Sequence, residues 1–142
     1  ERLVQVYKET YDVDISALAG AGAAGGLAGG LAALGAKLVP GFDIVAEEVE
    51  LDELLADVDL IITGEGFMDS ESFAGKVVGS MSELAAERKI PIAAICGDIH
   101  PDVQSRINSI SLVETFGRDE AMSQPLTCIE QAALQILRSA GA

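Results

Sequence analysis

The residues with the clearest chemical potential form one segment in the middle of the chain. Residues 63–66 read Thr-Gly-Glu-Gly, and Asp69 and Ser70 follow shortly after them. Two carboxylates and a hydroxyl suit the binding of Mg²⁺ or the activation of a substrate hydroxyl. The glycines that flank Glu65 would let the backbone come close to a ligand. We therefore treat Glu65 and Asp69 as candidate catalytic and Mg²⁺-binding residues.

The same segment continues into Gly75-Lys76, which opens a predicted helix. The N-terminal amides and the dipole of a helix favour an anion such as phosphate. Phosphoryl transfer needs a metal ion, a positioned hydroxyl and a neutralised phosphate, so the segment offers groups for each. The alternative is an acidic surface loop in which Asp69 or Ser70 only stabilises a turn. The location after a buried strand favours function, because ligands bind at the carboxyl edge of open α/β sheets.

A second candidate is the glycine-rich run at residues 20–30. Residues 20–25 match G-x-G-x-x-G, but the dinucleotide fingerprint also needs a preceding strand and a suitably placed acid. Residues 13–18 make a poor strand, so chance composition explains the match better. A glycine-rich turn before a helix can still bind phosphate or carboxylate in many folds. The candidate phosphate-binding positions in this run are Gly22, Gly25 and Gly26.

A third candidate is the pair Asp98 and His100, which suits acid–base chemistry or metal binding. The chain has one His and two Cys, so a zinc site is disfavoured, and a lone His near a turn is usually just exposed. Neither Gly-x-x-x-x-Gly-Lys-Ser/Thr nor Gly-x-Ser-x-Gly occurs in the sequence. A kinase built on this chain would therefore belong to a class without a P-loop.

The elements that must position these residues alternate along the second part of the chain. Continuous apolar runs predict strands that are buried on both faces of a sheet. The alternation with helices predicts an α/β fold with a parallel, Rossmann-like sheet, and right-handed crossovers place the strand ends on one edge. Strands are expected at residues 57–63, 91–96 and 109–113, helices at 51–56, 75–89 and 125–140, and loops at 64–73 and 97–101. Earlier in the chain, helices are expected at residues 2–11, from about 23 to 34 and at 44–50, and a short strand at 36–39.

Composition limits the classes of partner. The formal net charge of −14 over 142 residues opposes sequence-independent binding to nucleic acid. Residues 15–36 carry no charge, but Gly and Ala dominate them, so too few strongly apolar residues remain for a membrane span. Two cysteines cannot form a disulfide framework, and no signal peptide is visible, which fits a cytoplasmic protein.

Together these segments resemble the glycerate kinase family of bacterial glyoxylate and glucarate metabolism. The resemblance runs from about Leu3 to the final helix, and its most specific part is the block Thr-Gly-Glu-Gly, Asp-Ser and Gly-Lys. The segments that carry it are residues 20–31, 59–66, 69–70, 75–76 and 91–97.

The resemblance implies a two-domain α/β kinase that uses ATP and Mg²⁺ to phosphorylate D-glycerate. It implies that this chain is the C-terminal portion of a longer enzyme and is inactive without the missing N-terminal part. Residues 1–50 would end an inserted domain, and residues 51–142 would form the returning part of the Rossmann-like domain. Glu65 and Asp69 would be catalytic. The ligand's oxygens would be contacted by Gly64, Gly66, Ser70 and Lys76.

Two positions depart from the family pattern. Phe67 stands where the family usually has Arg, which removes a cation that could meet a phosphate or carboxylate. Val77-Val78 follows Gly-Lys where Ala-Pro or a similar pair is usual. Two other hypotheses stay open. One is a dinucleotide-binding oxidoreductase fragment based on residues 20–25, and the other is a non-catalytic truncated assembly piece whose apolar edges favour homo-oligomers.

Overall fold

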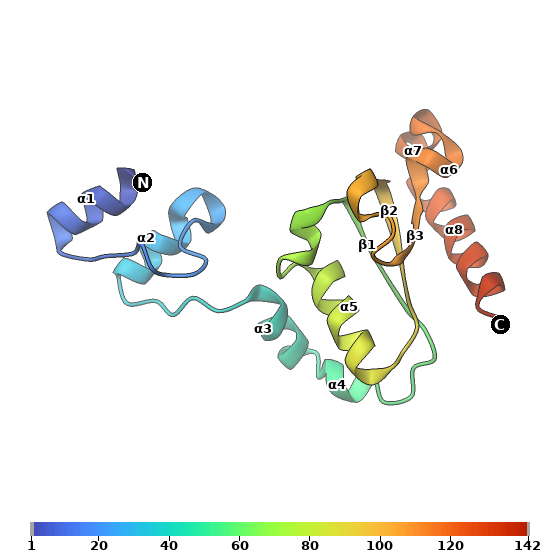
Figure 1. The fold of residues 1–142 in the computed structure, drawn as a ribbon, viewed down its shortest axis with the longest axis horizontal. Helices are drawn as coiled ribbons and strands as arrows, with labels where there is room; N and C mark the ends of the chain where they lie inside the picture. Colours follow the sequence, from blue (N-terminus) through green and yellow to red (C-terminus); the bar gives the residue numbers. More distant parts are fainter. Residues whose placement is uncertain (1, 142) are drawn as a thin grey trace. The chain divides into compact units, whose positions relative to one another are not determined.

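The computed structural model describes residues 2–141, which form two compact units (Figure 1). The units are Glu1–Val45 and Ala46–Ala142, and the division falls within helix α3 (Gly41–Glu48). Each unit is described by itself below. The assignment of the first unit to an inserted domain remains a prediction.

The second unit is built on a three-stranded parallel sheet. Its strands are β1 (Ile61–Met68), β2 (Ile92–Ile99) and β3 (Asn108–Ser111), in the order β1-β2-β3. The register places Glu65 of β1 beside Cys96 of β2, and Cys96 beside Ser111 of β3. The predicted α/β fold with a parallel sheet is therefore confirmed.

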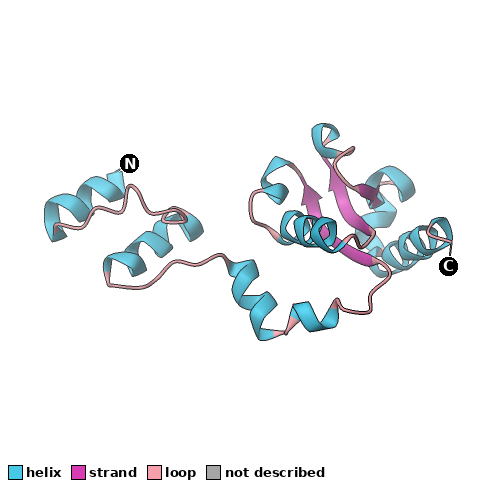
Figure 2. Ribbon diagram, turned by 60° about the horizontal axis from the view of Figure 1, so that its bottom comes forward, coloured by secondary structure: helices cyan, strands magenta, loops and turns pink. Residues whose placement is uncertain are grey.

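Helices cover both faces of this sheet, as parallel strands require. Helix α5 (Val77–Arg88) packs on one face through Val78 and Ala85. Helices α6 (Leu112–Phe116), α7 (Arg118–Ser123) and α8 (Pro125–Ser139) pack on the other. Figures 1 and 2 show α5 and α8 on opposite sides of the strands.

Helix α8 follows directly from its sequence pattern. Its buried residues are Cys128, Ala132 and Ile136, whose spacing of four places them on one helical face. Pro125 lies at the start of the helix, where its missing N–H costs no hydrogen bond. That face packs against Ala93 and Ile95 of β2, so the predicted closing helix is confirmed.

The strands differ from their predicted bounds. β1 continues through Met68, so Gly64 and Glu65 lie in a strand and not in the predicted loop at residues 64–73. β2 likewise continues to Ile99, into the predicted loop at residues 97–101. Glycine does not end these strands, because it is required there: a Cβ atom on Gly64 would collide with the carbonyl oxygen of Ile95. A Cβ atom on Gly97 would likewise collide with the carbonyl oxygen of Gly66.

Two other predictions of strand structure were wrong. β3 ends at Ser111, earlier than predicted, because Ser111 begins helix α6 by accepting a hydrogen bond from the Glu114 amide. Residues 36–39 form no strand, because no strand of the described residues 2–141 pairs with them. A short apolar run becomes a strand only where a partner lies beside it.

Short helices connect the two units and lead to β1. Helix α3 ends at Glu48, and helix α4 (Leu51–Leu54) begins after Glu50, whose φ of 52° separates the two helices. The predicted helix at residues 44–50 is therefore found three residues earlier. The predicted helix at residues 51–56 is found and ends sooner.

The first unit contains the predicted helix α1 (Arg2–Tyr11), a 3₁₀ turn (Ala23–Gly26) and helix α2 (Leu27–Ala33). The glycines of α2 allow close packing: a Cβ atom on Gly29 would lie 2.8 Å from the Ala21 carbonyl oxygen. A Cβ atom on Gly30 would lie 2.8 Å from the Tyr7 hydroxyl. Among the described residues, no helix is long and apolar enough to cross a membrane.

The glycines of β1 and β2 give a direct test of this packing. Gly64→Ala should lower the free energy of unfolding by about 1–3 kcal/mol, because the methyl group meets the Ile95 backbone. Gly66→Ala is the matched control: no atom lies within 4 Å of its Cβ position, so we expect a change within about 0.5 kcal/mol. Urea unfolding of the two variants measures both values. Equal losses would contradict the proposed collision.

Candidate functional site

Glu65 lies within the sheet, in the carboxyl half of β1. Its neighbour in the register is Cys96, which is fully buried. The Glu65 Oε1 atom is itself buried and has no hydrogen-bond partner among the described residues. A buried carboxylate oxygen without a partner costs about 1–3 kcal/mol or more. This oxygen is therefore the group in the segment that most needs a cation or a hydroxyl donor.

The pKa of the Cys96 thiol is affected by the same buried surroundings. Burial raises the pKa of the Cys96 thiol, and the nearby Glu65 carboxylate also disfavours the thiolate. Burial likewise raises the pKa of Cys128, which is 1% exposed in the core beneath α8. Both thiols are therefore neutral packing groups at ordinary pH.

Asp69 has a clear structural task at the end of β1. Its Oδ1 atom accepts hydrogen bonds from the amides of Glu71 (2.8 Å) and Ser72 (3.3 Å). In return, the Asp69 amide donates to the hydroxyl of Ser72 (3.0 Å), which is fully buried. This reciprocal capping box begins the 3₁₀ turn Ser70–Phe73 and fixes the path of the chain toward α5.

The extended strand also separates the two candidate carboxylates. Glu65 and Asp69 are four residues apart, and a rise of about 3.3 Å per residue places their Cα atoms about 13 Å apart. Mg²⁺ binds oxygen at about 2.1 Å, so a shared ion would require both side chains to turn toward each other. No group of three His, Cys, Asp or Glu side chains suited to a metal ion occurs within residues 2–141. Joint metal binding by this pair remains a prediction.

Asp98 and Ser111 form a polar link that the sequence analysis missed. The Ser111 hydroxyl donates to Asp98 Oδ1 (3.2 Å), and the Ile99 amide donates to the same oxygen (2.9 Å). Ser111 is only 4% exposed and also caps α6. The sequence Ser111-x-x-Glu114 is a capping-box signal that could have identified Ser111. The link to Asp98 depends on the pairing of β2 with β3, which the sequence does not reveal.

His100 does not join Asp98 in an acid–base pair. Its Nδ1 atom accepts a hydrogen bond from the Asp102 amide (3.3 Å) and caps the turn Pro101–Val103. The side chain is half exposed. His100 therefore has the local structural role that a histidine near a turn commonly has.

Lys76 is the N-cap residue of α5, as the sequence predicted for the start of this helix. Gly75 precedes it with φ of 89°, and no side chain caps the first turn of the helix. Ser70 is exposed in the preceding turn. The ligand contacts expected of Ser70 and Lys76 remain predictions.

A pocket of about 590 Å³ lies against β1. It brings together Gly64, Glu65 and Gly66, and its other walls are mostly apolar. Asp69, Ser70 and Lys76 do not line it. The remaining lining residues are Ile62, Thr63, Ile95, Gly97, Leu112, Ala121, Met122, Pro125 and Ile129.

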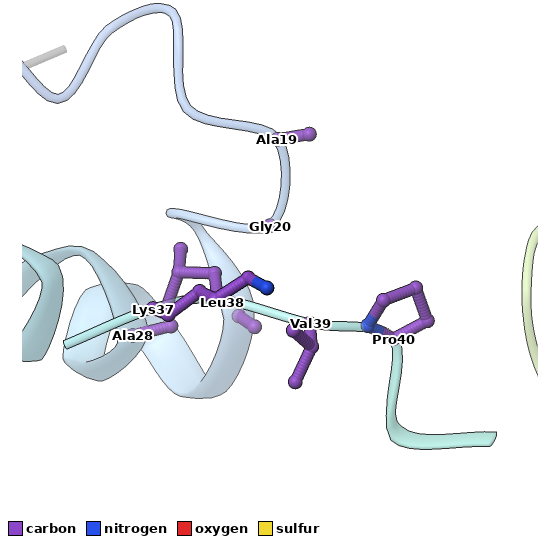
Figure 3. Close-up of a pocket in the computed structure, with 8 residues that line it drawn as sticks. Ala19, Gly20, Ala28, Lys37, Leu38, Val39 and Pro40 are labelled. Atoms are coloured by element: carbon purple, nitrogen blue, oxygen red, sulfur yellow. The ribbon is translucent and has the colours of Figure 1, made fainter. Parts of the chain in front are cut away.

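The first unit has its own pocket of about 430 Å³ beside the glycine-rich run (Figure 3). Gly20 lines this pocket, whereas Gly22, Gly25 and Gly26 do not. Gly25 and Gly26 have φ of 67° and 95°, and they turn the chain between the 3₁₀ helix and α2. The predicted contact of these three glycines with phosphate is not tested by this geometry.

A parallel sheet covered by helices on both faces defines a protein of the open-sheet α/β class, in which ligands bind at the carboxyl ends of the strands. The family model described as "Glycerate kinase family" matches residues 1–141. The chain belongs to this family. The predicted resemblance is therefore confirmed.

Individual relatives agree with the family match. The chain is 36% identical over 138 residues to a protein of Halalkalibacterium halodurans named glycerate kinase, covering 92% of this chain and 36% of the relative. It is 41% identical over 100 residues to the glycerate 2-kinase of Escherichia coli K12, covering 70% and 26%. A crystal structure from Salmonella typhimurium LT2, described as a candidate glycerate kinase 2, matches with a TM-score of 0.55 and 30% identity. That match covers 97% of this chain and 38% of the other. The chain thus spans between about a quarter and two fifths of the length of these relatives.

Two substitutions of Asp69 separate the effect of its capping hydrogen bonds on stability from the effect of its negative charge. Asp69→Ala should lower the free energy of unfolding by about 1 kcal/mol because the cap is lost. Asp69→Asn should change it by only a few tenths of a kcal/mol, because asparagine is an equally good N-cap. Thermal or urea unfolding of the two variants provides the comparison. An Asn variant as unstable as the Ala variant would show that the negative charge, and not the hydrogen bonds, stabilises the turn.

The two buried thiols predict a dependence of stability on pH. Their folded-state pKa values are raised, so their contribution to stability is complete below the unfolded pKa and is lost as pH rises above it. Since a free thiol titrates near pH 8.5, we expect the free energy of unfolding to fall above about pH 9. Urea unfolding from pH 7 to pH 10 measures this fall. The double variant Cys96→Ala/Cys128→Ala should lose less over the same range, and an equal loss would refute the assignment.

Proposed function

We propose that this chain is part of an ATP-dependent glycerate kinase and carries the Thr-Gly-Glu-Gly segment of its active site. The family match over residues 1–141 is the observation that carries this proposal. Relatives named glycerate kinase and glycerate 2-kinase support it. The substrates would be D-glycerate and ATP, and the products phosphoglycerate and ADP. The remaining part of a family-length enzyme would complete the active site.

In this reaction, a hydroxyl oxygen of D-glycerate bonds to the γ-phosphorus of ATP. The bond from the γ-phosphorus to the oxygen that bridges it to the β-phosphate breaks, and the hydroxyl proton passes to a base. Glu65 is the best candidate for this base, because its Oε1 atom has no hydrogen-bond partner among the described residues.

The alternative role for this oxygen is to bind a magnesium ion instead of the proton, because Mg²⁺ prefers carboxylate oxygens. Glu65 would hold the ion. The Asp69 Oδ2 atom makes none of the cap's hydrogen bonds, and it would join the ion only if both side chains turned toward each other. Bound Mg²⁺ would neutralise charge on the phosphates of ATP. Lys76 and the free amides at the start of α5 would contact phosphate or carboxylate oxygens.

Gly66 supports a ligand close to the backbone of β1. Gly64 is required by the approach of β2, whereas nothing lies within 4 Å of a Cβ atom on Gly66, and its φ needs no glycine. The fold therefore does not explain Gly66. A ligand in the adjacent pocket, which Gly66 lines, would explain it.

The alternative of a dinucleotide-binding oxidoreductase finds no support in the first unit. The fingerprint at residues 20–25 requires a strand before it, and the described residues before Gly20 form helix α1, extended residues and turns, with no strand. The non-catalytic alternative remains an outcome of the experiment below. Homo-oligomerisation and a cytoplasmic location stay predictions.

The kinase proposal can be tested in a family-length enzyme. Residues 1–142 would replace the matching segment of the Halalkalibacterium halodurans relative, and phosphorylation of D-glycerate would be measured with ATP and Mg²⁺. We expect activity in this graft and a fall in kcat of about 10²–10⁴-fold for Glu65→Gln, because the transferable proton site is lost.

The control is Glu83→Gln, which removes an exposed carboxylate on α5 and should leave kcat unchanged. Circular dichroism and a sharp thermal transition establish that each graft is folded. A folded graft without kinase activity would favour the non-catalytic alternative. An active graft that tolerates Glu65→Gln would remove Glu65 from the chemistry.

A further inference from the structure

The pocket of the first unit has two facing walls from separate stretches of the chain. Ala19, Gly20, Ala23 and Ala28 form one wall, and residues 37–40 form the other. Figure 3 shows the Lys37 side chain lying between the Gly20 turn and the Val39-Pro40 stretch. All the lining residues belong to the first unit, so the pocket exists within that unit alone.

The charge in this region is unusual for so acidic a protein. Lys37 is the single charged residue in the stretch 15–42, although the whole chain has a net charge of −14. None of the lining residues carries a carboxylate. The ion pairs of lysine and arginine among residues 2–141 involve Lys8 and Arg88, and none involves Lys37. The pocket therefore carries the positive charge of an exposed lysine that has no ion-pair partner in the described part of the protein.

Backbone donors lie beside this charge. In the described part of the chain, the amides of Gly20 and of residues 37–39 donate no hydrogen bond to protein. Residues 37–39 belong to no helix and pair with no strand of the described residues, so their N–H groups are available to another acceptor. Free amides together with an ammonium group are the usual donors to an oxyanion in proteins.

We propose that this pocket binds a small oxyanion, a carboxylate or a phosphate, through Lys37 and the amides of Gly20 and residues 38–39. The side chains of Leu38, Val39 and Pro40 would contact the carbon atoms of the ligand. The site differs from the one predicted from the sequence, which relied on Gly22, Gly25 and Gly26 at the start of a helix. Helix α2 has only seven residues, so the site depends on Lys37 and not on a helix dipole. It is independent of the reaction proposed for Glu65.

The test uses the 142-residue chain and backbone-amide NMR. The chain is titrated separately with D-glycerate and with inorganic phosphate, at constant ionic strength kept with sodium chloride. We expect saturable shifts at Gly20 and Lys37 with at least one of the two anions. Binding should weaken as salt is raised, because a charge-assisted contact is screened. The two titrations tell a carboxylate ligand from a phosphate ligand.

Three variants make the result specific. Lys37→Met should weaken binding about ten-fold or more, and Lys37→Arg should retain most of it, because the charge is kept. Lys89→Met removes an equal charge from the second unit and should leave binding unchanged. Absence of saturable shifts with both anions overturns the proposal. An equal loss in Lys37→Met and Lys89→Met also overturns it, because the binding would then follow net charge alone. Neither result depends on kinase activity.

Discussion

The close approach of β1 and β2 is the constraint on which the candidate site depends. Hydrogen-bonded strands lie about 4.8 Å apart, and a Cβ atom on Gly64 or Gly97 would collide with a backbone carbonyl oxygen of the neighbouring strand. This contact fixes the register that places Glu65 beside Cys96. β1 ends at Met68, and the Asp69 capping box that follows begins the turn that leads into α5.

At the carboxyl edge of this sheet, three polar residues have structural roles as helix or turn caps. Asp69 caps a 3₁₀ turn, Ser111 caps α6, and His100 caps the turn after β2. Caps and catalytic sites use the same residue types, because both need short side chains that accept or donate hydrogen bonds. Glu65 is the exception, since its buried oxygen satisfies no group of the described fold. The unsatisfied oxygen therefore singles out Glu65 among the candidate residues at this edge, which residue type alone does not do.

The sequence predicted those parts of the fold that depend on local pattern. The four-residue spacing of apolar residues in α8 and the apolar run of β2 were sufficient to identify both elements. It could not predict that residues 36–39 remain unpaired, because pairing depends on a distant partner. It also predicted a loop at Gly64, since glycine usually weakens a strand and its packing role appears only once β2 is in place. The grouping of Glu65 with Gly64 and Gly66 was predictable, but the Asp98–Ser111 link required the register of β2 with β3.

The glycines differ in whether, and for what structural reason, their positions require glycine. Gly29 and Gly64 are required by packing, and Gly25 and Gly26 by a positive φ. Gly66 has neither requirement, so alanine would fit the described fold at this position. Glycine costs conformational entropy in a strand, so its presence without a structural need implies some other use for the open space. That open space lies on the wall of the pocket that residues 64 and 65 also line, so a ligand in this pocket would come close to the β1 backbone.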